Sequence, residues 1–361
     1  MKQAMEKIDR MTLRTAHTRT RKLALAASVA MTAAFTFFSA QSVHAQKTFS
    51  VQDKWKVGGE GGWDYLLADP SVHRLYITHN NRVEVLDSVT GKPIGAITGL
   101  KGTHGVALDD SGRFGYISDG GASAVVVFDR STLATVASIP VGTGPDGIVF
   151  ESMTKTVWAF NGRSHNVSVI DTAARKVIAT IALPGKPEFP AADGTGQVYD
   201  NIEDKNEIVR LDAHSLKLTA TWPLDGLESP SGLAIDRVGK RLFAVCDGKK
   251  MAVVDYTTGK VIAKPDIGDG PDAAGYDPKT KLAFSSNGEG TLSVVDTANG
   301  FKTIQTLPTQ KGARTMTLDS STGKIYVVGA QYAPLATEAD TLPHPRPAVL
   351  PNTFTVLVIG Q

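Results

Sequence analysis

The 361-residue chain has little cysteine, no catalytic signature and no helical pattern, and each absence excludes a class of protein. A single cysteine, Cys246, excludes a disulfide-stapled scaffold and any CxxC metal or redox motif. The chain contains no HExxH motif, phosphate-binding loop, c-type haem site or Gly-x-Ser-x-Gly elbow. No stretch shows the apolar period of an amphipathic helix. Its 42% hydrophobic and 20% charged residues, with 35 glycines, indicate a globular protein built from strands.

Basic residues are concentrated at the start of the chain. Seven of the 38 Lys and Arg residues, but only two of the 36 Asp and Glu residues, lie in the first 45 positions. The rest carries 31 basic and 34 acidic residues, a formal charge of −3. Nonspecific nucleic-acid binding needs many cationic side chains that displace phosphate counterions. We therefore expect no nucleic-acid partner.

Residues 1–45 have the order of a secretory signal peptide. A basic stretch ending in Arg19–Lys22 precedes the uncharged run Leu23–Ala40, and Val43-His44-Ala45 offers a small-residue cleavage site before Gln46. The alternative is an uncleaved anchor, because 18 uncharged residues are borderline for a membrane span. Ala, Ser and Thr dilute the run, which favours cleavage. We expect a periplasmic or secreted protein of a bacterial envelope, monomeric and without a membrane span, whose mature part is residues 46–361.

The mature part repeats itself about every 42 residues. An alternating apolar run that ends in aspartate recurs six times at spacings of 42, 42, 41, 43 and 41, and a seventh copy, Val356–Gly360, closes the chain. The six aspartates are Asp87, Asp129, Asp171, Asp212, Asp255 and Asp296. A fixed period of this length is typical of propellers and solenoids.

Each repeat predicts four short strands separated by Gly, Pro and Thr-Gly-Lys turns. Four antiparallel strands, seven times, predict an all-β fold: a seven-bladed β-propeller forming one domain. The last copy, Arg314–Gly360, has only three strands, while Lys47–Val57 is a strand without a repeat. We expect this N-terminal strand to become the outer strand of the last blade and close the ring.

The repeat also resembles a known family, the YncE-like or YVTN-repeat propellers, which are related to lactonase-like propellers. The resemblance covers Trp55–Gly360 and rests on Pro145-Asp146-Gly147, Tyr116-Ile117-Ser118, Val167–Asp171 followed by Lys176–Ile181, and Ser286–Thr291. It implies the propeller fold. It does not imply one function, because such relatives include binding modules, lactone hydrolases and proteins without an assigned activity.

One candidate site follows from the repeat order. The residues that open the first strands should share one face around the axis, and they are Asp64, His104, Asp146, Glu188, Ser231, Asp272 and Arg314. Two like charges about 8 Å apart at an effective dielectric near 20 repel by about 2 kcal/mol. Four carboxylates against one arginine should therefore repel one another unless water screens them, a pKa rises, or a cation or amine binds. The alternative is a local role, since Asp and Ser commonly accept backbone N–H groups in turns.

A second tier lies where the second strands end. It consists of His79, Asp119, Asn161, Asn201, Asp247 and Asn287, which are either turn residues or ligands of a divalent metal. Lactonase-like propellers bind an axial metal through carboxylate and amide side chains. That resemblance implies Glu188, Asn161, Asn201 and Asp247 as possible ligands for Ca²⁺, Mg²⁺ or Zn²⁺.

Two segments on this face stand out. Asp200–Glu207 packs four carboxylates into eight residues and predicts a solvated loop or part of a cation site. The proline-rich segment 330–352 interrupts the last blade, and it suits a lid or a docking arm that places His344 and Arg346 over the mouth.

Three functions remain open. The first is binding of a small molecule or an envelope protein at an acidic axial mouth formed by Asp64, His104, Asp146, Glu188, Asp272 and Arg314, without catalysis. The second is a metal-dependent lactone or ester hydrolase, in which Glu188, Asp146 or His104 acts as the base. The third is a protein–protein scaffold in the cell envelope.

Overall fold

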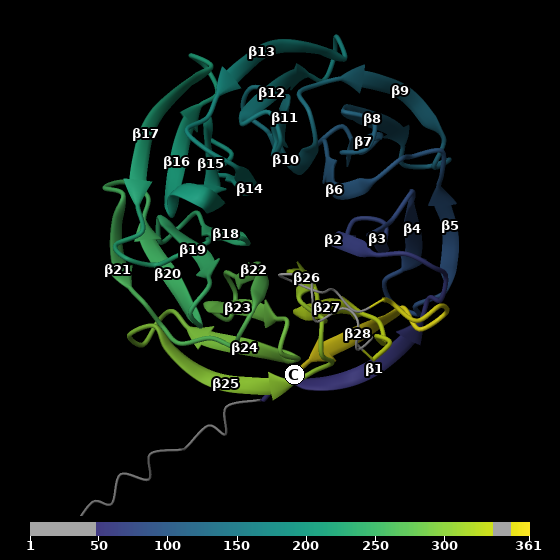
Figure 1. Cartoon of the computed structure of the whole chain (residues 1–361), viewed down its shortest axis with the longest axis vertical. Helices are drawn as coiled ribbons and strands as arrows, with labels where there is room; N and C mark the ends of the chain where they lie inside the picture. Colours follow the sequence, from purple (N-terminus) through teal and green to yellow (C-terminus); the bar gives the residue numbers. More distant parts are fainter. Residues whose placement is uncertain (1–47, 335–347) are drawn as a thin grey trace, which may run out of the picture. The chain divides into compact units, whose positions relative to one another are not determined.

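The computed structural model describes residues 48–334 and 348–361, which form seven four-stranded antiparallel sheets. Figure 1 shows these sheets as blades around a central axis, each with its first strand innermost. Blades consecutive in the chain are neighbours, and the first strand of the last blade contacts that of the first. The predicted seven-bladed β-propeller is therefore confirmed. The predicted signal peptide and the pair His344 and Arg346 lie outside the described residues.

Blades 1 to 6 each use four consecutive strands. Blades 1 to 3 contain β2 (Trp63–Asp69), β3 (Arg74–His79), β4 (Arg82–Asp87), β5 (Pro93–Ile97), β6 (Thr103–Leu108), β7 (Phe114–Asp119), β8 (Ala124–Asp129), β9 (Thr135–Pro140), β10 (Pro145–Glu151), β11 (Thr156–Asn161), β12 (Asn166–Asp171) and β13 (Lys176–Ala182). Blades 4 to 6 contain β14 (Pro187–Ala192), β15 (Gln197–Ile202), β16 (Glu207–Asp212), β17 (Lys217–Pro223), β18 (Leu233–Asp236), β19 (Arg241–Cys246), β20 (Lys250–Asp255), β21 (Lys260–Ala263), β22 (Pro271–Asp277), β23 (Leu282–Asn287), β24 (Thr291–Asp296) and β25 (Lys302–Pro308). One 3-10 turn, η1 (Glu203–Lys205), follows β15.

Blade 7 is completed by the N-terminal strand, as predicted. It contains β26 (Thr315–Asp319), β27 (Lys324–Gly329), β28 (Thr355–Gly360) and β1 (Ser50–Lys56), and β1 pairs antiparallel with β28. On β1, Trp55 is buried with its ring centroid 5.7 Å from that of Tyr326. The two ends of the propeller thus share one sheet, and the ring has no free edge at its junction.

The apolar core lies between the blades. Every second strand carries one buried aromatic residue at the same register position, and these are Tyr76, Tyr116, Trp158, Tyr199, Phe243, Phe284 and Tyr326. Tyr76 of blade 1 packs on Phe128 of blade 2, for example, with ring centroids 5.6 Å apart. Because each blade buries its faces only against its neighbours, the seven repeats form one cooperative unit.

The aspartates that mark the repeat cap turns. Asp87 Oδ1 accepts the backbone N–H groups of Val89 at 3.0 Å and Thr90 at 2.7 Å. Asp69, at the end of β2, accepts the N–H of Ser71 at 3.2 Å in the same way. These recurrent carboxylates therefore serve the fold, and the acidic residues at the other end of the first strands are the ones left for a site.

Candidate functional site

Five of the seven residues that open the first strands lie at β-bulges. Strict alternation would put Asp64 on the same sheet face as Leu66. Trp63 pairs with His79 and Leu66 with Ile77, so Asp64 and Tyr65 together oppose a single residue of β3. A bulge of this kind turns the strand and redirects its side chains. The pairing is irregular at the same point around His104, Asp146, Glu188 and Asp272.

Side chains of the preceding blade hold the backbone of several ring residues. Thr78 Oγ1 donates to the carbonyl of His104 at 3.1 Å, and Ser118 Oγ to that of Asp146 at 2.5 Å. Asn201 Nδ2 donates to the carbonyl of Ser231 at 2.7 Å. These bonds cross from one blade to the next and satisfy backbone groups that the bulges leave outside the strand ladder, so the ring is held by the propeller rather than by its loops.

The ring brings together three residues that are far apart in the chain. His104 Nδ1 lies 2.7 Å from Oδ2 of Asp64 and 3.6 Å from Oδ1 of Asp146. One ligand atom from each of these side chains lies within 4.8 Å of the others. All three side chains are partly exposed, so solutes can reach them from the mouth.

The charge state of His104 is set by its carboxylate neighbours. Burial by itself lowers the pKa of the imidazole, but the hydrogen bond to Asp64 and the charge of Asp146 outweigh it and raise that pKa to about 9. Burial raises the pKa of Asp146 to about 6, and the charge of Asp64 adds to that shift. Burial also raises the pKa of Asp64, and the hydrogen bond to His104 opposes that shift. At neutral pH His104 is therefore an imidazolium beside Asp64 and Asp146.

Glu188 has a basic neighbour that the repeat order does not reveal. The repeat order puts no basic ring residue beside Glu188, but Lys186 Nζ, two positions earlier and outside the ring positions, contacts both Glu188 Oε1 and Glu203 Oε2. Burial and the charge of Asp146 nevertheless raise the pKa of Glu188 to about 8, although Lys186 opposes the shift. In the sequence, only the position of Lys186, two residues before Glu188, indicated that it could reach this ring residue.

Arg314 pairs with one neighbour, as its place in the repeat order predicts. Its Nε lies 2.9 Å from Oδ2 of Asp272. Burial raises the pKa of Asp272 to about 6, and Arg314 moderates the shift. The remaining ring residue is Ser231. Its Oγ donates to the carbonyl of Pro271 at 3.1 Å, so this side chain has a local role.

Most of the second tier is used inside the blades. His79 is buried and packs on Phe354, with ring centroids 4.4 Å apart. Asp119 accepts the backbone N–H of Lys101. Asn161 donates to Asn166 at 2.7 Å, and Asn287 donates to the Thr291 hydroxyl at 3.0 Å. These contacts are local, but His79 Nε2 and Asn161 Oδ1 have no partner among the described residues, so both the turn and the metal-ligand interpretation stay predictions.

In blades 4 and 5 the structure corrects the register of this tier. The equivalents of His79 are Ile202 and Cys246, as strand pairing shows. Asn201 therefore lies one position earlier, on the opposite face of its strand, and Asp247 lies beyond β19 and is exposed. The described residues therefore do not place Asn161, Asn201 and Asp247 at equivalent positions, and a metal at Glu188 with these three residues stays a prediction.

The prediction of a solvated loop over residues 200–207 is wrong for residues 200–202. Asp200, Asn201 and Ile202 end strand β15 and are buried, and η1 follows them. Asp200 occupies the position of Ile77 and Ala159, and neither of its carboxylate oxygens has a hydrogen-bond partner among the described residues. Burial raises its pKa well above the ordinary value, and the charges of Glu188 and Asp146 add to this.

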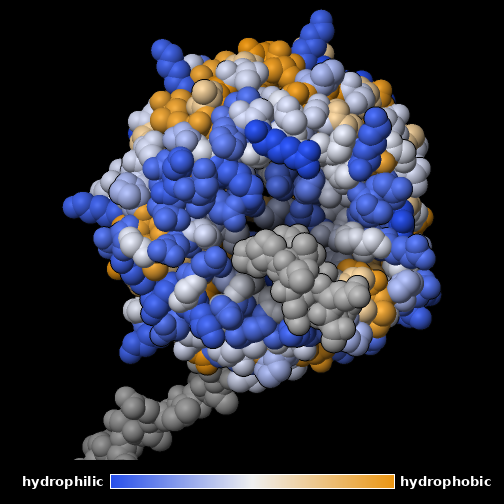
Figure 2. Space-filling view, in the orientation of Figure 1, coloured by the Kyte–Doolittle hydropathy of each residue, from blue (hydrophilic) through white to orange (hydrophobic). Residues whose placement is uncertain are grey.

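The surface around the axis is hydrophilic. Figure 2 shows polar side chains around a hollow at the centre of the propeller face. Among the described residues no helix is long and apolar enough to cross a membrane.

No family model matches the chain. The chain is 26% identical over 190 residues to "Uncharacterized protein YncE" of Escherichia coli O157:H7 and 27% identical over 190 residues to that of strain K12, an alignment that covers 48% of this chain and 54% of each relative. It thus spans about half the length of these relatives. The predicted resemblance to YncE-like propellers is confirmed.

Two solved structures share the fold. A chain of Kuenenia stuttgartiensis hydrazine synthase matches with a TM-score of 0.64 at 17% identity, covering 80% of this chain and 95% of that one. U3-55K matches with a TM-score of 0.70 at 9% identity, covering 84% and 98%. At these identities the likeness concerns the propeller architecture alone.

Proposed function

We propose that this protein is an exported, non-catalytic propeller that binds a small cationic ligand, an amine in particular, at its acidic axial mouth. The observation that carries the proposal is the crowding of carboxylates around the axis. Among the described residues, the cationic groups paired with Asp64, Asp146, Glu188, Glu203 and Asp272 are Lys186, Arg314 and the His104 imidazolium. The raised pKa values of Asp146, Glu188 and Asp272 mean that their ionised forms are disfavoured, and a bound cation would relieve this.

The charge on His104 favours an amine over a metal ion. Its Nδ1, the atom nearest both Asp64 and Asp146, carries a proton in the imidazolium form. A metal would have to displace that proton before it could bind there. An ammonium group needs only acceptors, and the carboxylates of the mouth provide them.

A metal-dependent lactone or ester hydrolase is the second candidate. Asp64, His104 and Asp146 offer two oxygens and one nitrogen, a donor set that suits Zn²⁺ or Mn²⁺ better than Ca²⁺ or Mg²⁺. Glu188, whose pKa is about 8, would act as the general base in its ionised form, which predominates only above about pH 8. The scaffold hypothesis stays a prediction, because most of the proline-rich segment lies outside the described residues.

A thermal-shift series separates the candidates. We expect a monoamine or diamine to raise the melting temperature of the wild type, and Glu188→Gln to reduce that shift. The matched control is Asp225→Asn, which removes one charge from an exposed side chain outside the ring. A shift produced by Zn²⁺ and not by amines, abolished by a chelator and accompanied by lactone turnover, would support the hydrolase instead.

A further inference from the structure

The axis is blocked below the acidic mouth by two aromatic rings. The residue after each ring position is small in five blades: Gly105, Gly147, Gly232, Ala273 and Thr315. In blades 1 and 4 it is Tyr65 and Phe189, whose ring centroids lie 4.5 Å apart. These blades are not neighbours, so the contact spans the axis. We call the pair Tyr65 and Phe189 the plug. Tyr65 also belongs to an apolar cluster with Ala273 and Met316, so blades 6 and 7 pack against the plug.

Not every blade has room for a side chain at the position that follows its ring residue. A Cβ on Gly147 would lie 2.1 Å from the carbonyl oxygen of Glu188, and one on Gly232 would lie 2.6 Å from that of Asp272. The next blade approaches the backbone too closely for a side chain at these positions. The two aromatic side chains are therefore the large groups at this level of the axis, where the other five blades carry Gly, Ala or Thr.

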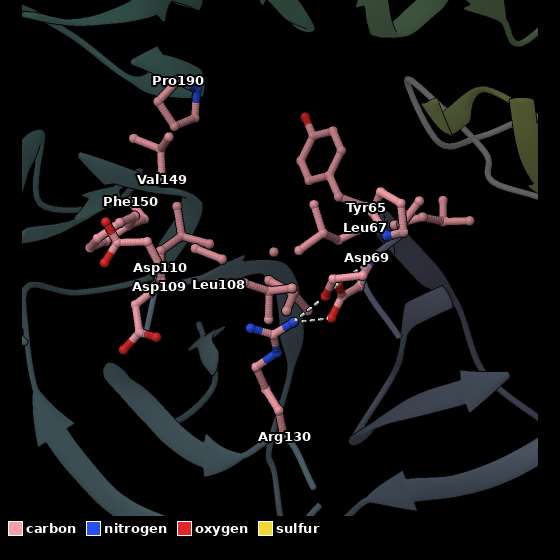
Figure 3. Close-up of a pocket in the computed structure, with 18 of the residues that line it drawn as sticks. Tyr65, Leu67, Asp69, Leu108, Asp109, Asp110, Arg130, Val149, Phe150 and Pro190 are labelled. Atoms are coloured by element: carbon pink, nitrogen blue, oxygen red, sulfur yellow. Dashed lines mark hydrogen bonds and ion pairs between the residues drawn. The ribbon is translucent and has the colours of Figure 1, made fainter. Parts of the chain in front are cut away.

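Beyond the plug, toward the other ends of the first strands, lies a cavity of about 640 Å³. Figure 3 shows it between the first strands of blades 1, 2 and 3, with Tyr65 and Pro190 at its inner side. Its walls are mostly aliphatic and aromatic, and they include Leu67, Val106, Leu108, Val149 and Phe150. This volume and this lining are those of a site for a small organic molecule.

One basic side chain, Arg130, lines the cavity and has a buried donor without an acceptor among the described residues. The Arg130 side chain is 9% exposed, and its Nη2 donates to Asp69 and, at 3.2 Å, to Ser71. Its buried Nε has no acceptor among the described residues. Figure 3 shows the guanidinium reaching into the cavity beside Asp69. Burying an N–H group without an acceptor is costly, and a ligand oxygen would remove that cost.

The surrounding charges select a neutral acceptor. Asp69 already neutralises Arg130, and Asp109 and Asp110 also line the cavity. An ionised carboxylate would be repelled by these aspartates, whereas a carbonyl oxygen accepts a hydrogen bond without a net charge. We propose that this apolar cavity, separated by the Tyr65–Phe189 plug from the acidic mouth, binds a neutral, largely apolar small molecule that carries a carbonyl group.

Benzophenone is a suitable probe, because it is neutral, apolar, carries one carbonyl and labels nearby C–H bonds under light. Irradiation of the full chain with benzophenone, followed by peptide mapping, is expected to label β2, β6 and β10 and to saturate. Labelling scattered over the surface, or no saturable labelling, would overturn the proposal. This measurement uses the wild-type protein and so does not depend on any variant folding.

Two variants that fill the cavity from different blades test its location. Val149→Trp and Leu67→Trp should each reduce labelling at least tenfold, whereas Ile178→Trp, on an exposed site of β13, should not. The Glu188→Gln variant should also label normally, so failure of this proposal and failure of the amine proposal are distinguishable. Unchanged labelling in both filled variants, with wild-type melting curves, would contradict the assignment.

Competition tests the carbonyl. Fluorenone should displace benzophenone at roughly tenfold lower concentration than fluorene, which has the same ring system without the oxygen. Arg130→Lys should reduce this preference because the ammonium group lacks the guanidinium's directed donors. Equal competition by fluorenone and fluorene would contradict a hydrogen bond between Arg130 and the ligand carbonyl.

Discussion

His104 Nδ1 lies 2.7 Å from Asp64 Oδ2, although the two residues are 40 positions apart and come from different blades. The same nitrogen lies 3.6 Å from Asp146, one further blade along. One imidazolium thus bridges three consecutive repeats, and its neighbours on either side are acidic. The mouth therefore carries more carboxylates than cationic groups among the described residues, and its behaviour depends on which of the carboxylates are ionised.

His104→Asn separates the amine proposal from the hydrolase. Removing the imidazolium makes the mouth more negative, so the affinity for an amine should rise, by roughly tenfold if about 1.4 kcal/mol of repulsion is lost. Titration calorimetry measures this change at constant salt. If the site holds a metal through this nitrogen, the same variant should lose the metal, and an elemental analysis showing that loss would contradict the amine proposal.

Stability should fall as the pH rises through the range of the mouth residues. The pKa of Glu188 is raised from 4.5 to about 8 and that of His104 from 6.5 to about 9, so the folded state holds more protons than the unfolded state in these intervals. Each contribution is complete below the unfolded pKa and is lost as the pH passes the folded pKa. Melting curves should thus shift to lower temperature between pH 4.5 and about 9.

In Glu188→Gln, the melting temperature should fall less steeply with pH between pH 4.5 and about 8. The decline due to His104, which extends to about pH 9, should remain. The glutamine cannot ionise, so no proton is lost from this position. An unchanged slope in the variant would show that Glu188 does not titrate in this interval.

Ring closure depends on Trp55. Truncation by Trp55→Ala removes a buried ring that packs on Tyr326 and should lower the free energy of unfolding by about 3 kcal/mol, measured by urea denaturation. Val51→Ala on the same strand changes a side chain that is 41% exposed and should stay within about 0.5 kcal/mol of the wild type. Equal effects of the two variants would mean that β1 is not held by this packing.

Adjacent residues of β15 should respond to alanine in opposite directions. Asp200→Ala removes a buried carboxyl without partners from a position that Ala159 and Ala244 fill in other blades, and should raise stability by about 1 kcal/mol. Asn201→Ala removes a donor to Ser231 and should lower stability by about 1 kcal/mol. Destabilisation by Asp200→Ala in chemical denaturation would indicate a partner for this carboxyl.

The ring of site residues could be predicted because the repeat fixes equivalence. Asp64, His104 and Asp146 share a register position, and Arg314 meets Asp272 because consecutive repeats become neighbouring blades. Lys186 could not be predicted, because it reaches Glu188 from outside the equivalent positions. The placement of Asn201 failed for another reason: a shift of one residue in a strand moves a side chain to the opposite face, and spacing alone does not resolve one residue.

The sequence by itself determined the number of blades, their four strands and the closure by the N-terminal strand, because a 42-residue period and alternating apolar residues leave one way to bury every face. Only the tertiary structure decided which polar groups touch and which are sealed from water. It placed Tyr65 against Phe189 across the axis, buried Asp200 between blades and left Arg130 with a donor that has no acceptor in the described part of the chain. These outcomes depend on bulges and on distances between strands far apart in the chain, and neither is encoded in local pattern.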